Sequence, residues 1–109
     1  MSRAVKIAEL NDLLRETFLT GRVVLTEGIA ALSNDLREAV ITEVRTFRTF
    51  NADNDPHGEH DFGACDLAGI GKVFWKIDYY DTDYRCLSPD PADPSVTRRV
   101  LTIMLAEEY

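Results

Sequence analysis

The segment Asn51–Gly63 holds the densest group of side chains in this chain that could do chemistry. Its thirteen residues include four carboxylates, both histidines and two glycines. Carboxylates and histidines can transfer protons or bind cations, so this density suits a binding site. The segment matches no catalytic signature, and the serines and cysteines of the chain stand in no nucleophile motif.

Residues 59–80 are predicted to form a β-hairpin that would bring part of this group together with side chains further along the chain. Apolar residues at every second position over 73–79 are typical of a strand with one buried face. A two-residue turn at Gly69-Ile70 would set the pairing register. In that register Phe62 and Ala64 would face the core.

The other side of the same hairpin would place Asp61 opposite Asp78, and Glu59 opposite Tyr80. Like charges opposite each other destabilise a strand pair, and a cation, a shared proton or Lys76 would relieve that repulsion. A site built from Glu59, Asp61 and Asp78 would suit Mg²⁺, Mn²⁺ or Ca²⁺. The alternative is a pair of exposed, hydrated carboxylates whose repulsion is weak in water.

Either histidine could be a general base or a ligand, and the catalytic candidates are His60, Asp61 and Asp78. On a strand His60 would point to the core side, opposite Tyr79. A hydrogen-bonded structural histidine is the alternative role at that position. His57 falls in the loop, where an exposed side chain is expected.

A second group of residues is better suited to binding a partner. Phe74 and Tyr80 would lie on the face of the hairpin away from the core, and aromatic side chains are frequent anchors of protein interfaces. Asp81 and Asp83 follow directly and add negative charge. Arg98-Arg99 could bind phosphate, although a solvated pair or a salt bridge to the acidic loop is the alternative.

The charge of the chain is unevenly distributed. Residues 51–95 carry ten carboxylates against three basic residues, a net charge of −7, and the other segments together carry nine of each. Such a surface repels nucleic-acid phosphates and attracts a basic protein surface. No apolar run is long enough to span a membrane, and Glu9 and Asp12 interrupt the N-terminal segment before a signal peptide could develop. We therefore expect a cytoplasmic protein.

The elements that would position these residues indicate an α+β fold in one domain, residues 1–109. Amphipathic helices are predicted over 3–19, and from an N-cap at Ser33 to about residue 50. Two helices would then pack on a small antiparallel sheet. The expected elements are the helices, a short strand at 22–26, the hairpin at 59–80, a proline-rich loop at 81–94 and a final strand or helix at 98–109.

Four blocks together resemble a bacterial family of proteins, the domain of unknown function 3768. These blocks are Asn54–Gly63, Phe74–Asp81, Ser88–Pro94 and Arg99–Tyr109. The resemblance runs from about Val23 to the C-terminus and implies an association with plasmids and other mobile elements, as a helper in gene transfer or anti-restriction defence. The family pattern usually has Tyr where this chain has His57.

Two hypotheses follow for the function. The first is a non-enzymatic protein-binding module whose acidic face engages a basic partner, with no direct nucleic-acid binding. The second is a small divalent-metal-dependent enzyme, for example a hydrolase, that uses the carboxylates and His60 of the hairpin.

Overall fold

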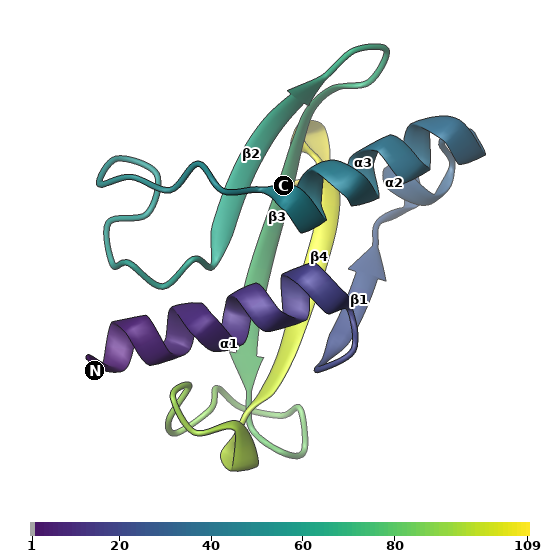
Figure 1. The fold of residues 1–109 in the computed structure, drawn as a ribbon. Coiled ribbons are helices and arrows are strands. Elements are labelled where there is room, and N and C mark those ends of the chain that lie inside the picture. The colour runs from purple at the N-terminus through teal and green to yellow at the C-terminus, as the bar shows by residue number, and fades with distance from the viewer. Residues whose placement is uncertain (1) are drawn as a thin grey trace.

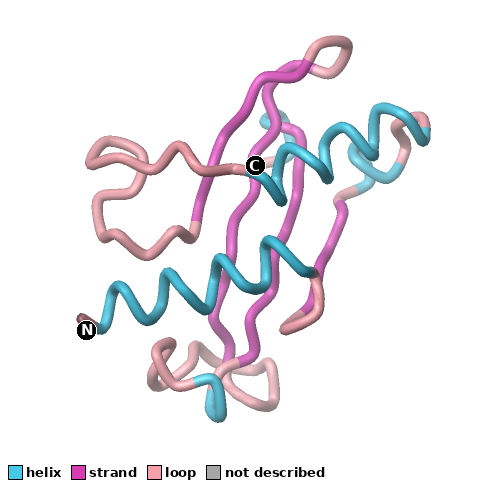
Figure 2. Tube along the Cα trace, in the orientation of Figure 1, coloured by secondary structure: helices cyan, strands magenta, loops and turns pink. Residues whose placement is uncertain are grey.

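The protein has one layer of helices on one face of a four-stranded sheet (Figures 1 and 2), as seen in a computed structural model that describes residues 2–109. The helices are α1 (Arg3–Thr17), α2 (Glu27–Ala30) and α3 (Asn34–Thr46). The strands are β1 (Arg22–Leu25), β2 (Phe62–Leu67), β3 (Gly71–Tyr80) and β4 (Arg98–Leu105), with 3₁₀ turns at Pro94–Val96 and Ala106–Glu108. The predicted α+β class is confirmed.

The sheet has the strand order β1-β4-β3-β2. The strands β2, β3 and β4 form an antiparallel meander, so the last segment, for which a strand and a helix were both possible, is a strand. The fourth strand, β1, pairs parallel to β4, and the sheet is mixed where a purely antiparallel one was predicted. Parallel neighbours need a long crossover between them, and here the chain between β1 and β4 contains both other strands and two helices.

Capping residues set where the two long helices begin. The Ser2 hydroxyl accepts a 3.1 Å hydrogen bond from the Val5 N–H, and Ser33 accepts a 3.3 Å bond from the Leu36 N–H, as predicted for Ser33. Both helices end a few residues earlier than predicted. α1 ends where Phe18 takes a left-handed conformation with φ 61°, which breaks the helical repeat.

The core lies between the helix layer and one face of the sheet. Trp75 at its centre is fully buried, and the edges of the Phe47 and Phe50 rings pack toward it at centroid distances of 5.6 and 6.1 Å. Each fully buried aliphatic side chain contributes about 1.5–3 kcal/mol. The other core residues are Leu14, Ile29, Val40, Val44, Val73, Ile77, Leu101 and Ile103.

No helix among residues 2–109 combines the length and the apolar character that crossing a membrane requires.

Candidate functional site

The strands of the hairpin pair one residue away from the predicted register. Trp75 lies opposite Gly63, and the Ile77 N–H donates a 2.8 Å hydrogen bond to the Asp61 carbonyl. A slip of one residue turns every side chain of a strand to the other face. The predicted opposition of Asp61 and Asp78 is therefore wrong.

The turn and one glycine account for this register. Leu67 pairs with Gly71, so the loop has three residues where two were predicted. Gly69 and Gly71 have φ values of 81° and 102°, a region that only glycine adopts readily. At Gly63 an added Cβ would lie 2.5 Å from Cε2 of Trp75, so the indole occupies the space that a larger residue would fill.

The same slip corrects the predicted core positions on β2. Phe62 and Ala64 lie opposite Lys76 and Phe74, on the side of the sheet away from the helices. The prediction that they face the core is wrong, because Gly63 and its alternate neighbours take that side.

The three predicted metal ligands do not come together. Asp78 forms a 3.0 Å ion pair with Lys76, and this hydrogen bond raises the pKa of the Lys76 ammonium. Glu59 lies before β2 and does not pair with Tyr80. Asp61 is partly buried, and this burial raises the pKa of its carboxyl. Residues 2–109 contain no group of three His, Cys, Asp or Glu side chains placed to hold a metal ion. The geometry therefore gives no support to the hydrolase hypothesis.

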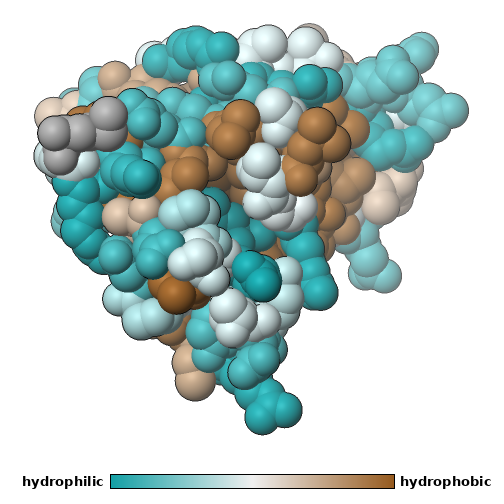
Figure 3. All heavy atoms as spheres, turned by 60° about the horizontal axis from the view of Figure 1, so that its bottom comes forward, coloured by the Kyte–Doolittle hydropathy of each residue, from teal (hydrophilic) through white to brown (hydrophobic). Residues whose placement is uncertain are grey.

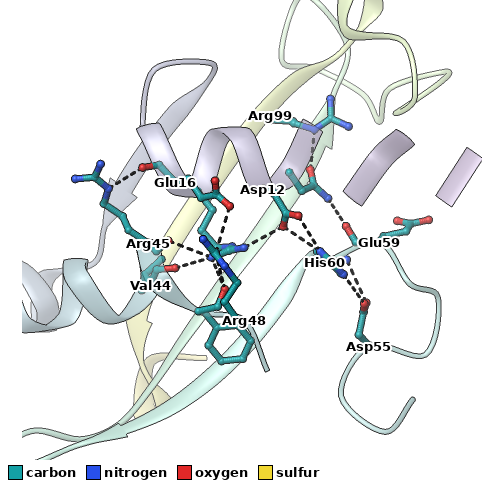
Figure 4. Close-up of polar contacts among 12 residues, drawn as sticks. Asp12, Glu16, Val44, Arg45, Arg48, Asp55, Glu59, His60 and Arg99 are labelled. Carbon is teal, nitrogen blue, oxygen red and sulfur yellow. Dashed lines mark hydrogen bonds and ion pairs between the residues drawn. The ribbon is translucent and has the colours of Figure 1, made fainter. Parts of the chain in front are cut away.

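His60 lies in the loop before β2, where a strand position opposite Tyr79 was predicted, and its backbone is left-handed with φ 56°. Its ring stacks on Phe50 at 3.8 Å between centroids and an interplanar angle of 3°. Nδ1 lies 3.0 Å from Oδ1 of Asp12, and Nε2 lies 3.7 Å from Oδ2 of Asp55 (Figure 4). The histidine is hydrogen-bonded, as one alternative anticipated, but its partners differ from those expected.

A second set of hydrogen bonds, centred on Asn11 and Tyr79, lies beside this histidine. The amide of Asn11 donates to the Glu59 carbonyl at 2.9 Å and to the Tyr79 hydroxyl at 2.8 Å, and its oxygen accepts from Nε of Arg99 at 2.7 Å. The Tyr79 hydroxyl donates in turn to the Glu59 carboxylate at 3.1 Å. Burial raises the pKa of Tyr79, so this hydroxyl stays protonated and can donate.

Arg15 completes the arrangement from the next turn of α1. Its side chain is 1% exposed and bonds the Asp12 carboxylate at 2.9 Å. It also donates to the backbone carbonyls of Val44 and Phe47, both at 2.9 Å, at the end of α3. A buried cation is stable only when paired and hydrogen-bonded. Both terminal nitrogens of Arg15 have such partners, whereas its buried Nε has no hydrogen-bond partner within residues 2–109.

Sequence reasoning missed the contributions of α1 to this network. The charged residues of α1 were expected to alternate with its apolar stripe, yet the buried face of α1 includes Asn11 and Arg15 beside Ile7, Ala8 and Leu14. The spacing along the chain could have predicted their burial, because Asn11 and Arg15 lie four and eight residues after Ile7, on the same helical face.

The chemistry available to this network is limited to sharing protons and holding segments together. His60 lies between two carboxylates, and within residues 2–109 it forms no hydrogen bond with a serine, threonine or cysteine side chain. The contacts join α1, the loop before β2, the end of α3 and the strands β3 and β4. The arrangement thus interlocks the fold and lacks the parts of a nucleophilic site.

The face of the sheet away from the helices, here called the open face, carries the predicted partner-binding aromatics. Phe74 and Tyr80 lie on this face as predicted, because Val73 and Trp75 point to the core. Phe74 packs with Phe62 and Tyr109 at centroid distances of 5.4 and 5.5 Å. The three rings form a cluster, called here the aromatic cluster, and side chains such as Lys76, Asp78, Val24 and Thr102 share the face.

Eight of the ten carboxylates of residues 51–95 lie outside the strands, and the other two, Asp66 and Asp78, lie on β2 and β3. Asp81 accepts hydrogen bonds from the N–H groups of Arg85 and Asp83, which lower the pKa of its carboxyl, so this residue shapes a turn. Asp83 is exposed. The predicted acidic surface therefore flanks the aromatic residues.

A family model described as Protein of unknown function (DUF3768) matches residues 25–108. The chain belongs to the DUF3768 family. No curated protein and no solved structure matches it.

The range that matches the DUF3768 family model contains only part of the polar network. His60, Tyr79 and Arg99 lie inside the matched range, whereas their partners on α1 precede it. The strands β2, β3 and β4 lie wholly within the match, so most of the open face belongs to the part of the chain that defines the family.

Proposed function

We propose that this DUF3768 protein is a non-enzymatic binding module of the cytoplasm that holds a basic protein partner on its open face. The observation that carries the proposal is the one-sided fold: α1 and α3 cover one face of the sheet, and no helix of residues 2–109 covers the other (Figure 1). Aromatic side chains on a sheet face without a helix can anchor a protein partner.

The open face supplies anchors of the kind that interfaces use. Phe74 and Tyr80 are half-buried and rigidly held on a central strand. Aromatic residues in such settings contribute a large share of interface energy. Tyr109, 76% exposed, is the most exposed member of the aromatic cluster.

Charge would bring the partner to this face. The chain has a formal net charge of −7, and Asp81 and Asp83 follow directly after the last residue of β3. A basic protein would be attracted over a long range, with an association rate that falls as salt rises. The resemblance to a mobile-element family suggests a partner in nucleic-acid processing or host defence, while nucleic acid itself would be repelled.

Affinity capture from a bacterial lysate at low salt, followed by titration of the captured protein, tests the proposal. Phe74→Ala and Tyr80→Ala should each weaken binding about tenfold or more, which corresponds to at least ~1.4 kcal/mol. Leu19→Ala is the matched control, since Leu19 is 84% exposed and lies outside the sheet. Equal affinity for all three variants, with unchanged melting temperatures, would refute the docking face.

A further inference from the structure

The strand β2 forms one edge of the sheet, and its outer side is unpaired. It has β3 on one side and no strand of residues 2–109 on the other (Figure 2). The Ile77 N–H bonds the Asp61 carbonyl, so the odd-numbered residues bond β3 and the even-numbered residues of β2 direct their backbone groups outward. The outward N–H and C=O groups of Phe62, Ala64 and Asp66 form no backbone hydrogen bond within the described residues.

The strand β2 lacks the features that usually protect an edge. Natural edge strands are commonly short, or they carry lysine, proline or a bulge that discourages pairing with another chain. β2 has six residues in unbroken register with β3 and contains neither lysine nor proline. Its one charged residue, Asp66, forms an exposed 3.7 Å pair with Lys72. The other edge strand, β1, has four residues and begins with Arg22, so β2 is the edge better suited to receive a further strand.

A hollow of about 350 Å³ lies beside this edge, between the end of α3 and β2. Ala64 and Cys65 line it from the strand, and Glu43 and Asn54 are among the residues that line it from the other side. In a strand added to β2, successive side chains would point to opposite sides of the sheet. One set would enter the hollow, and the other set would lie along the open face next to Phe62.

The end of the molecule opposite the β2–β3 turn presents loops and strand ends instead of a strand edge. Figure 3 shows this end, where apolar side chains gather among hydrophilic ones, and residues 81–97 connect β3 to β4 there. Strand ends do not offer the regular series of outward N–H and C=O groups that a free edge offers. A partner that pairs through its backbone is therefore expected along β2.

The charge around β2 indicates a basic segment as the occupant. Glu43 in the hollow and Asp61 just before β2 form no ion pair within residues 2–109. Arg48, a cation that lines the same hollow, is already paired with Glu16 at 3.2 Å. A second copy of the chain would bring another net charge of −7 to this edge, which opposes self-association through β2.

We propose that β2 is a strand-addition site, at which an extended basic segment of a protein partner pairs with the outward backbone groups of Phe62, Ala64 and Asp66. In this mode of recognition the backbone bonds supply affinity, and the alternate side chains supply selectivity. Lysine or arginine side chains of the segment would enter the hollow and face Glu43. This inference rests on the proposed function, because it takes the same basic partner and adds how that partner is held.

Amide hydrogen exchange with a defined peptide tests the site. The probe is an octapeptide of alternating lysine and threonine with blocked termini, and its matched control is the same peptide methylated at every backbone nitrogen, which removes its N–H donors. Saturating probe should slow exchange of the Ala64 and Asp66 amides about tenfold or more. The Gly63 and Cys65 amides, which already bond β3, should change little. The methylated peptide should give no protection.

Two substitutions test the edge and its charge separately. Ala64→Pro removes an outward N–H, a change that edge strands tolerate, and should weaken probe binding about tenfold or more. Glu43→Gln should weaken it about threefold, as expected for an exposed charge pair. Glu38→Gln is the matched control, because Glu38 is exposed on the same helix but does not line the hollow. The methylated peptide makes the same test on the wild-type protein if Ala64→Pro does not fold.

Three results would overturn the inference: no saturable probe binding, equal binding of the methylated peptide, or no protection at Ala64 and Asp66. Protection of these two amides without peptide, together with a dimer in sedimentation equilibrium, would also overturn it, because a second copy would then occupy the edge.

Capture of the natural partner separates this inference from the proposed function. Full affinity in Ala64→Pro with weakened binding in Phe74→Ala would refute the added strand and leave docking on the open face intact. Unchanged affinity in Phe74→Ala and Tyr80→Ala would refute that docking instead, whereas protection by the probe is measured without any captured protein.

Discussion

At the scale of single residues, the side chain that matters most to stability is a charged one in the core. Arg15 holds the end of α3 through two carbonyls and neutralises Asp12, which in turn contacts His60. Removing one member of a buried ion pair leaves the other members without their partners.

Arg15→Met should therefore destabilise the protein by about 3–5 kcal/mol, the usual cost of breaking a buried pair. The variant keeps an apolar side chain of similar length, so the loss would report the missing charge and hydrogen bonds. Urea denaturation measures the change in unfolding free energy. Arg45→Met is the control: Arg45 is exposed and bonds only the Glu16 carbonyl at 2.8 Å. A similar loss in both variants would contradict this role for Arg15.

At the scale of elements, the register of β2 against β3 decides which side chains reach the open face. The indole of Trp75 lies over Gly63 and leaves no room for a methyl group there. Ala64, its neighbour, points the other way and is exposed.

Gly63→Ala should cost about 1–3 kcal/mol, as expected when a methyl group is forced into a packed core. Ala64→Val adds more volume but should change the unfolding free energy by no more than about 0.5 kcal/mol, as is usual for a surface position. Thermal or urea unfolding measures both. The reverse order of costs would favour the register predicted from the two-residue turn.

The join between α2 and the C-terminal segment is also an element-scale feature. The Glu108 carboxylate accepts from the Thr26 hydroxyl at 2.6 Å and from the N–H groups of Gly28 and Leu105, both at 2.9 Å. These bonds, led by that from Thr26, lower the pKa of Glu108 below its usual 4.5.

Because this pKa is lower in the folded than in the unfolded protein, the carboxylate stabilises the fold above pH 4.5. That stabilisation is lost as pH falls through the folded-state pKa. Glu108→Gln should lower the urea midpoint at neutral pH, and the difference from wild type should shrink in acid. Glu107→Gln is the control, since Glu107 is also exposed but its carboxylate accepts none of the hydrogen bonds that Glu108 accepts. A difference that is constant with pH would count against this role.

At the scale of the whole molecule, the two faces of the sheet and the loops at its ends carry different kinds of side chain. Helices and the polar network occupy one face, and the aromatic cluster lies on the other. Most of the negative charge lies in loops, where several carboxylates accept backbone hydrogen bonds. The net charge can thus steer a partner without an acidic patch on the docking surface itself.

Much of the architecture could be predicted because it depends on local patterns. The cap at Ser33, the short strand at Arg22 and the alternation along β3 each follow from neighbouring residues. The hairpin register could not be predicted in this way, since two-residue and three-residue turns are both compatible with Gly69 and Gly71. The packing of Trp75 over Gly63 favours the three-residue turn. This contact joins residues of two different strands, so it does not follow from neighbouring residues in the sequence.

The sequence by itself determined the α+β class, the hairpin of β2 and β3, the outward placement of Phe74 and Tyr80, and the family. Periodicity, capping and turn chemistry act over a few residues, so they can be read along the chain. The tertiary structure alone decided that the last segment is a strand, that Asp61 and Asp78 lie apart, and that Arg15 and Asn11 are buried. These outcomes depend on which segments meet in space, because a charged side chain is buried only where distant groups satisfy it.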